Sequence, residues 1–269
     1  MTKSIFLFFL IFVNVFLFGQ ANQWSLVNTY ANTKIKAWDI DPMGKLIFAK
    51  NDAITKLDTS FQVRFTQSVK SFGEVTKIDA RHSLKTLLFS EEQQAIAFVD
   101  NTLTMHKGMK DLSKLNISFA TTASYSAQTN RYWIFDGDNS TLVLIDEIRN
   151  RPQTLENLGG IVGAFDITDL MEMENVLLLF DKSKGIYLFD VYGSLIDFIE
   201  TTEARAIHFS EGVIYYITDK ELVSINTRNR NQRRIQLPEE NIDSFRVLGS
   251  YFYFKTPQHI RKYLLKKRS

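Results

Sequence analysis

The sequence predicts an all-β fold, a six-bladed β-propeller of four-stranded blades closed by an N-terminal strand. Short apolar runs separated by polar turns recur along the chain. Equivalent turns recur at about 40 residues, which is the period of a four-stranded propeller blade. Helical repeats would instead show a sustained 3.6-residue periodicity, and the sequence contains no such stretch.

The repeat unit is clearest in residues 174–200, where three apolar runs alternate with two polar turns. Residues 176–180 and 186–189 are separated by a turn that ends in Gly185, and a turn through Gly193 leads into residues 195–199. Because Asp and Gly favour tight reversals and positive φ, this stretch predicts three consecutive antiparallel strands.

Six copies of the unit align on the residue that follows the second apolar run. These residues are Asp58, Asp100, Asp146, Asp190, Asn226 and Tyr263. A further strand precedes the unit, as in residues 35–40, 75–79, 161–167 and 206–209. Residues 24–30 would supply the outer strand that the sixth blade lacks, which removes an exposed sheet edge. A ring of five or seven blades remains an alternative, because residues 104–116 and 148–158 are interpreted as additional loops.

The unit at residues 181–193 resembles the repeats of the six-bladed propellers of the NHL-like and WD40-like superfamily. In those repeats, an apolar strand, a polar turn, a second apolar strand and an Asp-x-x-Gly-like turn follow one another. One repeat of this chain matches well and the others match loosely. The resemblance implies architecture only, because these propellers include scaffolds, sugar or nucleic-acid binders, and lactone or ester hydrolases.

Residues 1–21 have the pattern of a secretory signal peptide. Lys3 is the only charged residue there, residues 5–18 are almost entirely apolar, and Gly19 and Ala21 precede the expected cleavage site. The apolar run is too short to span a bilayer as a helix, although a retained anchor is the alternative. The propeller domain would then comprise residues 22–269, with no transmembrane span after cleavage. The sequence contains no cysteine, which excludes disulfides and a lipid-modified N-terminal cysteine.

The composition after signal removal is nearly balanced in charge, since Lys3 is the only one of 32 basic residues that is lost, against 30 acidic residues. We therefore expect no nucleic-acid partner. Frequent Lys, Asn, Ile and Phe, with a signal that ends in Phe-Gly-Gln, indicate an exported bacterial protein, in the periplasm or cell envelope or secreted. It is expected to be monomeric on its own and to bind an envelope protein.

The carboxylates near the innermost strands are the only candidates for a metal site. They are Asp39, Asp41, Asp79, Asp166 and Asp169, of which Asp41, Asp79 and Asp166 are retained as weak calcium candidates. Three of the six repeats offer no matching carboxylate, so turn capping is the preferred interpretation. Four scattered histidines do not predict a zinc site, and the glycine-rich residues 159–163 open a strand rather than a helix.

Two basic clusters are candidates for a partner surface. Arg228, Arg230, Arg233 and Arg234 lie in one predicted hairpin, and the chain ends in a basic tail. We find no catalytic or cofactor-binding signature, so an enzyme is disfavoured but not excluded. The leading hypothesis is an exported protein-interaction scaffold of the cell envelope. The alternatives are a calcium-dependent, lactonase- or esterase-like hydrolase with its site in the central channel, or a carbohydrate- or peptide-binding module.

Overall fold

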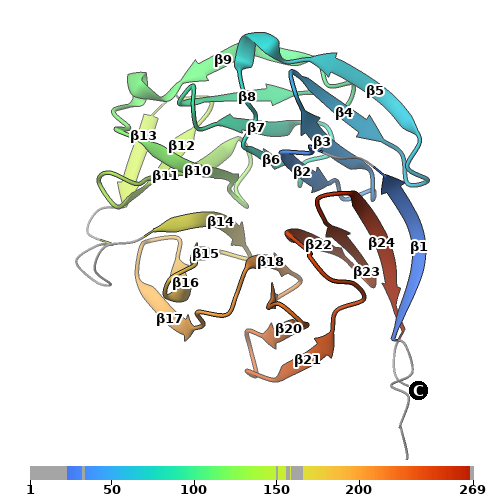
Figure 1. The fold of residues 1–269 in the computed structure, drawn as a ribbon. Coiled ribbons are helices and arrows are strands. Elements are labelled where there is room, and N and C mark those ends of the chain that lie inside the picture. Colours follow the sequence, from blue (N-terminus) through green and yellow to red (C-terminus); the bar gives the residue numbers. More distant parts are fainter. Residues whose placement is uncertain (1–22, 32–33, 150, 156–157, 159–165, 267–269) are drawn as a thin grey trace, which may run out of the picture.

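The computed structural model describes residues 23–31, 34–149, 151–155, 158 and 166–266 of the 269-residue chain. Within these residues, 24 strands form six four-stranded antiparallel sheets around a central axis (Figure 1). The sheets are the blades of a six-bladed β-propeller, and the predicted fold class is confirmed. The signal peptide predicted for residues 1–21 lies outside the described residues.

In the first five blades the strands follow one another in chain order from the channel outward. Blade 1 contains β2 (Ala37–Ile40), β3 (Leu46–Lys50), β4 (Ala53–Leu57) and β5 (Val63–Ser68). Blade 2 contains β6 (Lys77–Asp79), β7 (Thr86–Ser90), β8 (Ala95–Val99) and β9 (Met105–Asp111). Blade 3 contains β10 (Ala120–Tyr125), β11 (Arg131–Asp136), β12 (Thr141–Asp146) and β13 (Arg151–Leu155).

Blades 4 and 5 repeat this arrangement, and two short 3₁₀ helices lie in the connections before blades 2 and 3. Blade 4 contains β14 (Ile167–Met173), β15 (Val176–Asp181), β16 (Gly185–Asp190) and β17 (Leu195–Glu200). Blade 5 contains β18 (Ala206–Ser210), β19 (Val213–Ile217), β20 (Glu221–Asn226) and β21 (Gln232–Gln236). The helices are η1 (Lys70–Phe72) and η2 (Leu112–Leu115).

Blade 6 is built from both ends of the chain. Its strands, from the channel outward, are β22 (Ser244–Leu248), β23 (Tyr251–Lys255), β24 (His259–Leu265) and the N-terminal β1 (Trp24–Ala31). The predicted closure by the N-terminal strand is therefore confirmed (Figure 1). Trp24 anchors β1: its ring lies edge-on to Phe252 and Phe254, and its Nε1–H donates to the Gln236 carbonyl at 2.7 Å.

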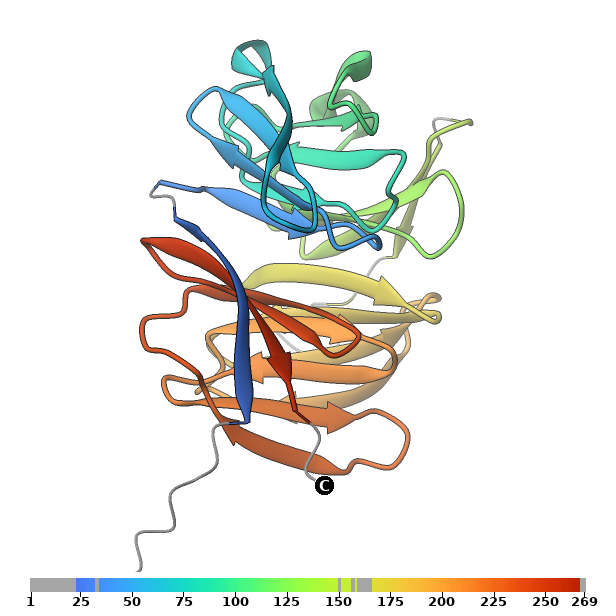
Figure 2. The ribbon, with the colours of Figure 1, turned by 90° about the vertical axis from the view of Figure 1, so that its right-hand side faces the viewer.

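The inner strands give the ring two different faces. Residues at the beginnings of these strands line one end of the central channel, and residues at their ends line the other. We call the face where the inner strands begin the top face and the opposite one the bottom face; Figure 2 shows the ring from its edge. Because each blade is antiparallel, the turns between its first and second strands, and between its third and fourth strands, lie on the bottom face.

The apolar core lies between neighbouring blades rather than at the ring centre. One cluster combines Phe89 and Phe98 of blade 2 with Tyr132 and Ile145 of blade 3, and similar clusters join the other blades. These side chains are almost fully buried. Burying each large apolar side chain contributes about 1.5–3 kcal/mol, so blade-to-blade packing holds the ring together without disulfides.

The aspartates used to align the repeats cap bottom-face turns. Asp58 Oδ1, for example, accepts the backbone N–H groups of Ser60 and Gln62 at 2.9 and 3.0 Å. Equivalent side-chain oxygens accept turn N–H groups at Asp100, Asp146, Asp190 and Asn226. Tyr263 lies within β24, where no such turn follows, because β1 comes from the other end of the chain.

Two details of the prediction were wrong. The inner strand of blade 4 is residues 167–173 rather than 161–167, and residues 159–165, including the glycine-rich stretch, lie outside the described residues. The supposed extra loops 104–116 and 148–158 contain the outer strands β9 and β13. These outer strands lack the apolar alternation of a half-buried strand, because solvent covers much of their surface. Among the described residues, no helix is long and apolar enough to cross a membrane.

Candidate functional site

Six side chains, one from the inner strand of each blade, form a ring around the central channel. They are Asp39, Asp79, Ser124, Met171, His208 and Arg246. On the bottom side they line a cavity of about 180 Å³, and a second cavity of about 260 Å³ occupies the top mouth. Lys77, Asp169 and Arg246 border both cavities, so they lie at the level that separates them.

Arg246 and Asp39 join blade 6 to blade 1. Arg246 Nε donates to Asp39 Oδ1 at 2.6 Å, and a second N–H donates to the Trp38 carbonyl. The other carboxylate oxygen accepts the Ala80 N–H at 2.7 Å, which ties in blade 2. Burial, which the Arg246 charge only partly offsets, raises the pKa of Asp39.

Asp79 and Arg81 join blades 2, 3 and 4. Asp79 accepts Arg81 Nε at 3.0 Å, the Ser124 hydroxyl at 3.0 Å and the Tyr125 N–H at 2.9 Å. Arg81 also donates to the backbone carbonyl of Glu172. Burial alone would raise the pKa of Asp79, but the Arg81 charge and the Tyr125 hydrogen bond lower it to about 2.

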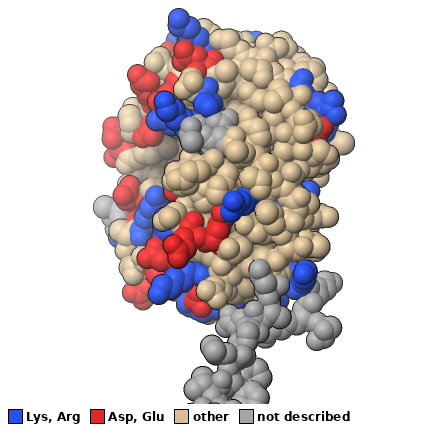
Figure 3. Space-filling view, turned by 45° about the vertical axis from the view of Figure 1, so that its right-hand side comes forward, with Lys and Arg blue, Asp and Glu red and all other residues tan. Residues whose placement is uncertain are grey.

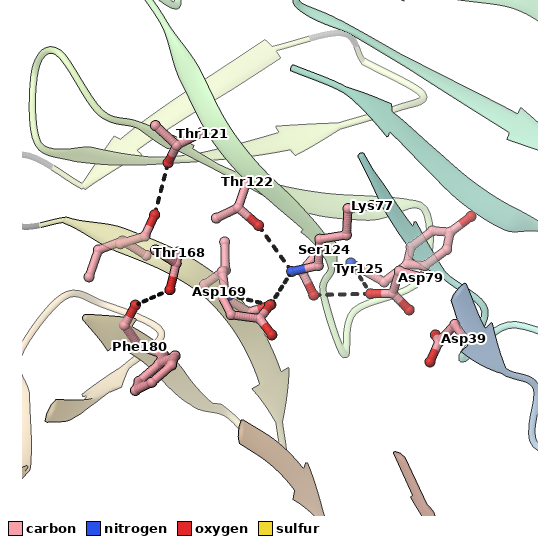
Figure 4. A network of polar contacts seen from close by, with 12 residues as sticks. Asp39, Lys77, Asp79, Thr121, Thr122, Ser124, Tyr125, Thr168, Asp169 and Phe180 are labelled. Carbon is pink, nitrogen blue, oxygen red and sulfur yellow. Dashed lines mark hydrogen bonds and ion pairs between the residues drawn. The ribbon is translucent and has the colours of Figure 1, made fainter. Parts of the chain in front are cut away.

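Lys77 crosses the channel from blade 2 to blades 3 and 4 (Figure 4). Its ammonium group donates to Thr122 Oγ1 at 3.0 Å, Asp169 Oδ1 at 2.5 Å and the Leu170 carbonyl at 3.1 Å. Burial opposes ionisation of Asp169, yet Lys77 and Arg246 together lower its pKa. Three carboxylates therefore face three cations, and the channel charge is internally balanced.

His208 is the contribution of blade 5 to the ring. Burial, reinforced by the Arg246 charge, lowers the pKa of His208 to about 3, so the imidazole is neutral at physiological pH. The ring hydrogen-bonds to the backbone of Val247, and its Nδ1 has no partner and is not accessible. His208 therefore contributes packing to the channel wall rather than a proton acceptor within reach of a ligand.

The structure does not bring the three calcium candidates together. Only Asp79 lies in the channel. Asp41 is fully buried in blade 1, where it caps a turn and forms an ion pair with Lys56 at 3.3 Å. Asp166 is exposed, and its backbone N–H donates to Asp181. Across the described residues, no group of three or more His, Cys, Asp or Glu side chains is arranged to hold a metal ion.

The predicted arginine cluster is largely neutralised by carboxylates. Arg228 pairs with Glu174, Arg230 with Asp197, and Arg234 with Glu203 and Glu221. Arg233 donates to the Gln23 side chain at 3.2 Å. On the surface that Figure 3 shows, basic and acidic side chains are likewise intermingled.

The bottom face carries a set of exposed apolar turns. Tyr192, Ile148, Leu84 and Met43 are the four most exposed large apolar side chains of the described residues, at 82%, 78%, 75% and 61%. All four lie in turns that the antiparallel topology places on this face. Leu84 and Ile148 are next in sequence to Lys85 and Glu147, whose ion pair joins the bottom-face turns of blades 2 and 3.

Sequence reasoning missed the channel cations and the apolar turns. Lys77, Asp79 and Arg81 alternate with Ile78 and Ala80, a period-two pattern that places three charges on one face of a strand. That pattern could have identified a charged channel wall. The exposed turn residues carry no local signal, because single apolar residues in turns are common and only the topology gathers them.

Comparisons with known proteins show the fold. No protein-family model matches the chain, and no curated protein matches its sequence. A structure of streptogramin B lyase is similar over 90% of this chain and 98% of its own, with 12% identity and a TM-score of 0.66. A structure of virginiamycin B lyase from Staphylococcus aureus is similar over 90% of this chain and 99% of its own, with 9% identity and a TM-score of 0.66. A structure of Raptor from Chaetomium thermophilum is similar over 91% of this chain and 30% of its own, with 12% identity and a TM-score of 0.61. These similarities support the overall fold of the chain and, at such low identity, nothing finer.

Proposed function

We propose that the protein is an exported scaffold of a bacterial cell envelope and that its bottom face binds another protein. The observation that carries this proposal is the gathering of the four most exposed apolar side chains in turns of one face. Exposed apolar side chains gathered on one surface are typical of protein-binding sites, where they supply the buried centre of the interface.

The channel supports a structural role rather than a catalytic one. Its carboxylates are held by Arg246, Arg81 and Lys77. Ion pairs join blade 6 to blade 1 and blade 2 to blade 4, and the hydrogen bonds of Asp79 to Ser124 and Tyr125 add blade 3. A general acid or base needs a titratable group that can exchange a proton with a substrate. Asp79 is instead held ionised by four hydrogen bonds from neighbouring groups.

The mixed surface charge favours a partner that binds through apolar contacts with a polar rim. Such an interface should keep much of its affinity at raised salt, because exposed charges are screened whereas apolar burial is not. The similarity to two lyases does not alter this proposal, because at 12% and 9% identity that similarity concerns the fold alone.

Crosslinking the tagged protein in its native envelope, followed by affinity purification and mass spectrometry, tests the proposal. We expect one stoichiometric partner that is retained at high salt. The variant Leu84→Asp/Ile148→Asp should lose this partner. A matched control is Val63→Asp/Phe65→Asp, which changes two exposed apolar side chains on the outer strand β5 and should retain it.

Recovery of the protein alone, or equal loss of the partner in both variants, would contradict a bottom-face scaffold. The export component has its own readout. N-terminal sequencing of the protein from the envelope fraction should begin at Asn22, and an intact Met1 would refute cleavage after Ala21.

A further inference from the structure

The top mouth of the channel is a polar cavity that the bottom-face proposal does not use. It measures about 260 Å³, and all six blades contribute to its wall. Hydroxyl side chains from blades 2, 3, 4 and 6 line it. They are Thr76, Thr121, Thr122, Thr168 and Ser244.

Three of these threonines have fixed hydroxyl orientations. Thr76 donates to the Phe89 carbonyl at 3.2 Å, Thr121 to the Ile167 carbonyl at 3.1 Å and Thr168 to the Phe180 carbonyl at 3.3 Å. Figure 4 shows the last two bonds on neighbouring blades. Because each hydroxyl proton is engaged with the backbone, each oxygen can only accept hydrogen bonds. The Thr76 oxygen already accepts the Glu91 N–H at 3.1 Å, so Thr121 and Thr168 are the acceptors most available to a ligand.

Below the threonines, Lys77 has no hydrogen left to donate, whereas Asp169 keeps an oxygen that can accept. An ammonium group has three N–H donors, and the three of Lys77 are engaged by Thr122, Asp169 and Leu170. Both hydrogen bonds to the Asp169 side chain fall on Oδ1. That side chain is a quarter exposed, so its Oδ2 can accept a further hydrogen bond.

We propose that the top mouth binds a neutral polyhydroxyl ring, a single saccharide unit. The wall offers acceptors at Thr121, Thr168 and Asp169. It also offers hydroxyl donors at Thr122 and Ser244, whose oxygens accept Lys77 Nζ and Trp38 Nε1. A ligand whose groups both donate and accept, as sugar hydroxyls do, matches this wall. A cationic ligand is disfavoured by Lys36, Lys77 and Arg246, and an anion is disfavoured by Asp169 and Glu91, all of which border the cavity. Drug-sized ligands occupy pockets of about 300–1,000 Å³, so this smaller cavity fits one ring. The site lies opposite the proposed protein-binding face and does not depend on it.

Isothermal titration calorimetry and saturation-transfer NMR on the purified protein test this site. The probes are glucose, galactose, mannose and N-acetylglucosamine. Tetrahydropyran, which has the ring without hydroxyl donors, inorganic phosphate and methylammonium are the comparison compounds. We expect at least one sugar to bind in the millimolar range, and none of the comparison compounds to bind as well.

Isosteric variants locate the binding. Thr121→Val and Thr168→Val each remove one acceptor and should raise the Kd for the sugar roughly fivefold, the effect of one hydrogen bond. Thr66→Val is the matched control, because Thr66 pairs with Thr55 through exposed hydroxyls on the rim of blade 1. It should leave the Kd unchanged.

Several results would overturn the proposal. They are no binding by any of the four sugars, equal binding of tetrahydropyran, preferential binding of phosphate or methylammonium, or an unchanged Kd in both threonine variants. Circular dichroism and the melting temperature of each variant establish that it is folded. If Thr168→Val fails to fold, Thr121→Val still decides the location. Competition between a free sugar and its methyl glycoside distinguishes a free monosaccharide from a unit within a glycan.

Discussion

At the scale of single residues, the most consequential groups are the paired charges of the channel. Arg246 and Asp39 have side-chain exposures of only 17% and 13%, so neither is fully solvated. Removing one partner leaves the other charge buried without compensation, which costs more than the intact pair contributes. The channel charges are therefore expected to matter for the association of the blades.

Arg246→Met should lower the free energy of unfolding by about 3–5 kcal/mol, because Asp39 loses its counter-ion while still buried. Urea unfolding followed by tryptophan fluorescence measures this loss. The double variant Asp39→Asn/Arg246→Met should recover part of it. Arg64→Met, which breaks an exposed pair with Asp58, should change stability little. A loss of similar size in both arginine variants would contradict the assignment.

Acid should destabilise the protein through its bound carboxylates. The folded pKa of Asp79 is about 2, below the ordinary 3.8, and the pKa values of Asp136 and Asp181 are also lowered. A depressed folded pKa gives stability that is present above the unfolded pKa and lost as pH falls toward the folded one. Asp79 alone contributes about 2 kcal/mol in this way. Asp39, whose pKa is raised, acts in the opposite direction.

We therefore expect the free energy of unfolding to fall between about pH 4 and pH 2. Asp79→Asn should be less stable at pH 7 and should flatten this dependence. Asp219→Asn, which alters an exposed carboxylate paired with Arg205, should retain the slope of the parent protein. Denaturant titrations at several pH values measure all three. An Asp79→Asn variant with an unchanged acid slope would refute this contribution.

At the scale of elements, closure of the ring depends on β1. The strand pairs with β24 along its length, with a bulge between Leu26 and Asn28, and Trp24 packs against the aromatic side chains of blade 6. A strand bulge at an exposed edge disfavours pairing with another chain. β1 thus completes blade 6 and shapes its outer edge.

Trp24→Ala should cost about 3–5 kcal/mol, because it removes a buried aromatic side chain and its hydrogen bond to Gln236. Thr29→Ala, at an exposed position of the same strand, is the control and should have a small effect. Thermal and urea unfolding provide the measurement. If the two variants are equally stable, Trp24 is not the anchor of the closure.

Gly185 determines whether the outer strand of blade 4 can pair. Its φ is +143°, and a Cβ added there would collide with the Ile199 carbonyl oxygen on β17. Gly185→Ala should therefore destabilise by at least about 1–3 kcal/mol, the cost of strained backbone, and should raise amide hydrogen exchange in β17. Gly108→Ala is the control, because φ is also positive there but the added Cβ meets no atom within 4 Å. The difference between the two variants measures the destabilisation caused by the steric clash. Protection of β17 equal to that of the parent would contradict this prediction.

At the scale of the whole molecule, stability should be independent of metal ions. Binding calcium in the channel would require Asp39, Asp79 and Asp169 to leave their cations, because calcium needs six to eight converging oxygens. We expect the melting temperature to be the same in EDTA and in millimolar calcium. Scanning calorimetry under both conditions tests this. A rise with calcium would favour the channel-hydrolase alternative over the scaffold.

The repeated pattern of the sequence was sufficient to predict the architecture of this protein. Repeated apolar runs and turn-capping residues such as Asp58 and Asp190 are local features, so they can be recognised without knowing what packs against what. The closure of the ring by residues 24–30 was also predictable, because the sixth repeat lacks one strand of the four that a blade needs. The inner strand of blade 4 was placed six residues too early, because its polar side chains face a channel that a local pattern does not reveal.

The candidate sites depend on the tertiary structure. Lys77 and Asp169 are 92 residues apart and Arg246 and Asp39 are 207 apart, so their pairing depends on how the six blades close around one axis. The same closure separates Asp41 and Asp166 from Asp79. It also places Met43, Leu84, Ile148 and Tyr192 on one face and the channel threonines at the other. Sequence spacing carries no record of these contacts, because they arise from packing between blades.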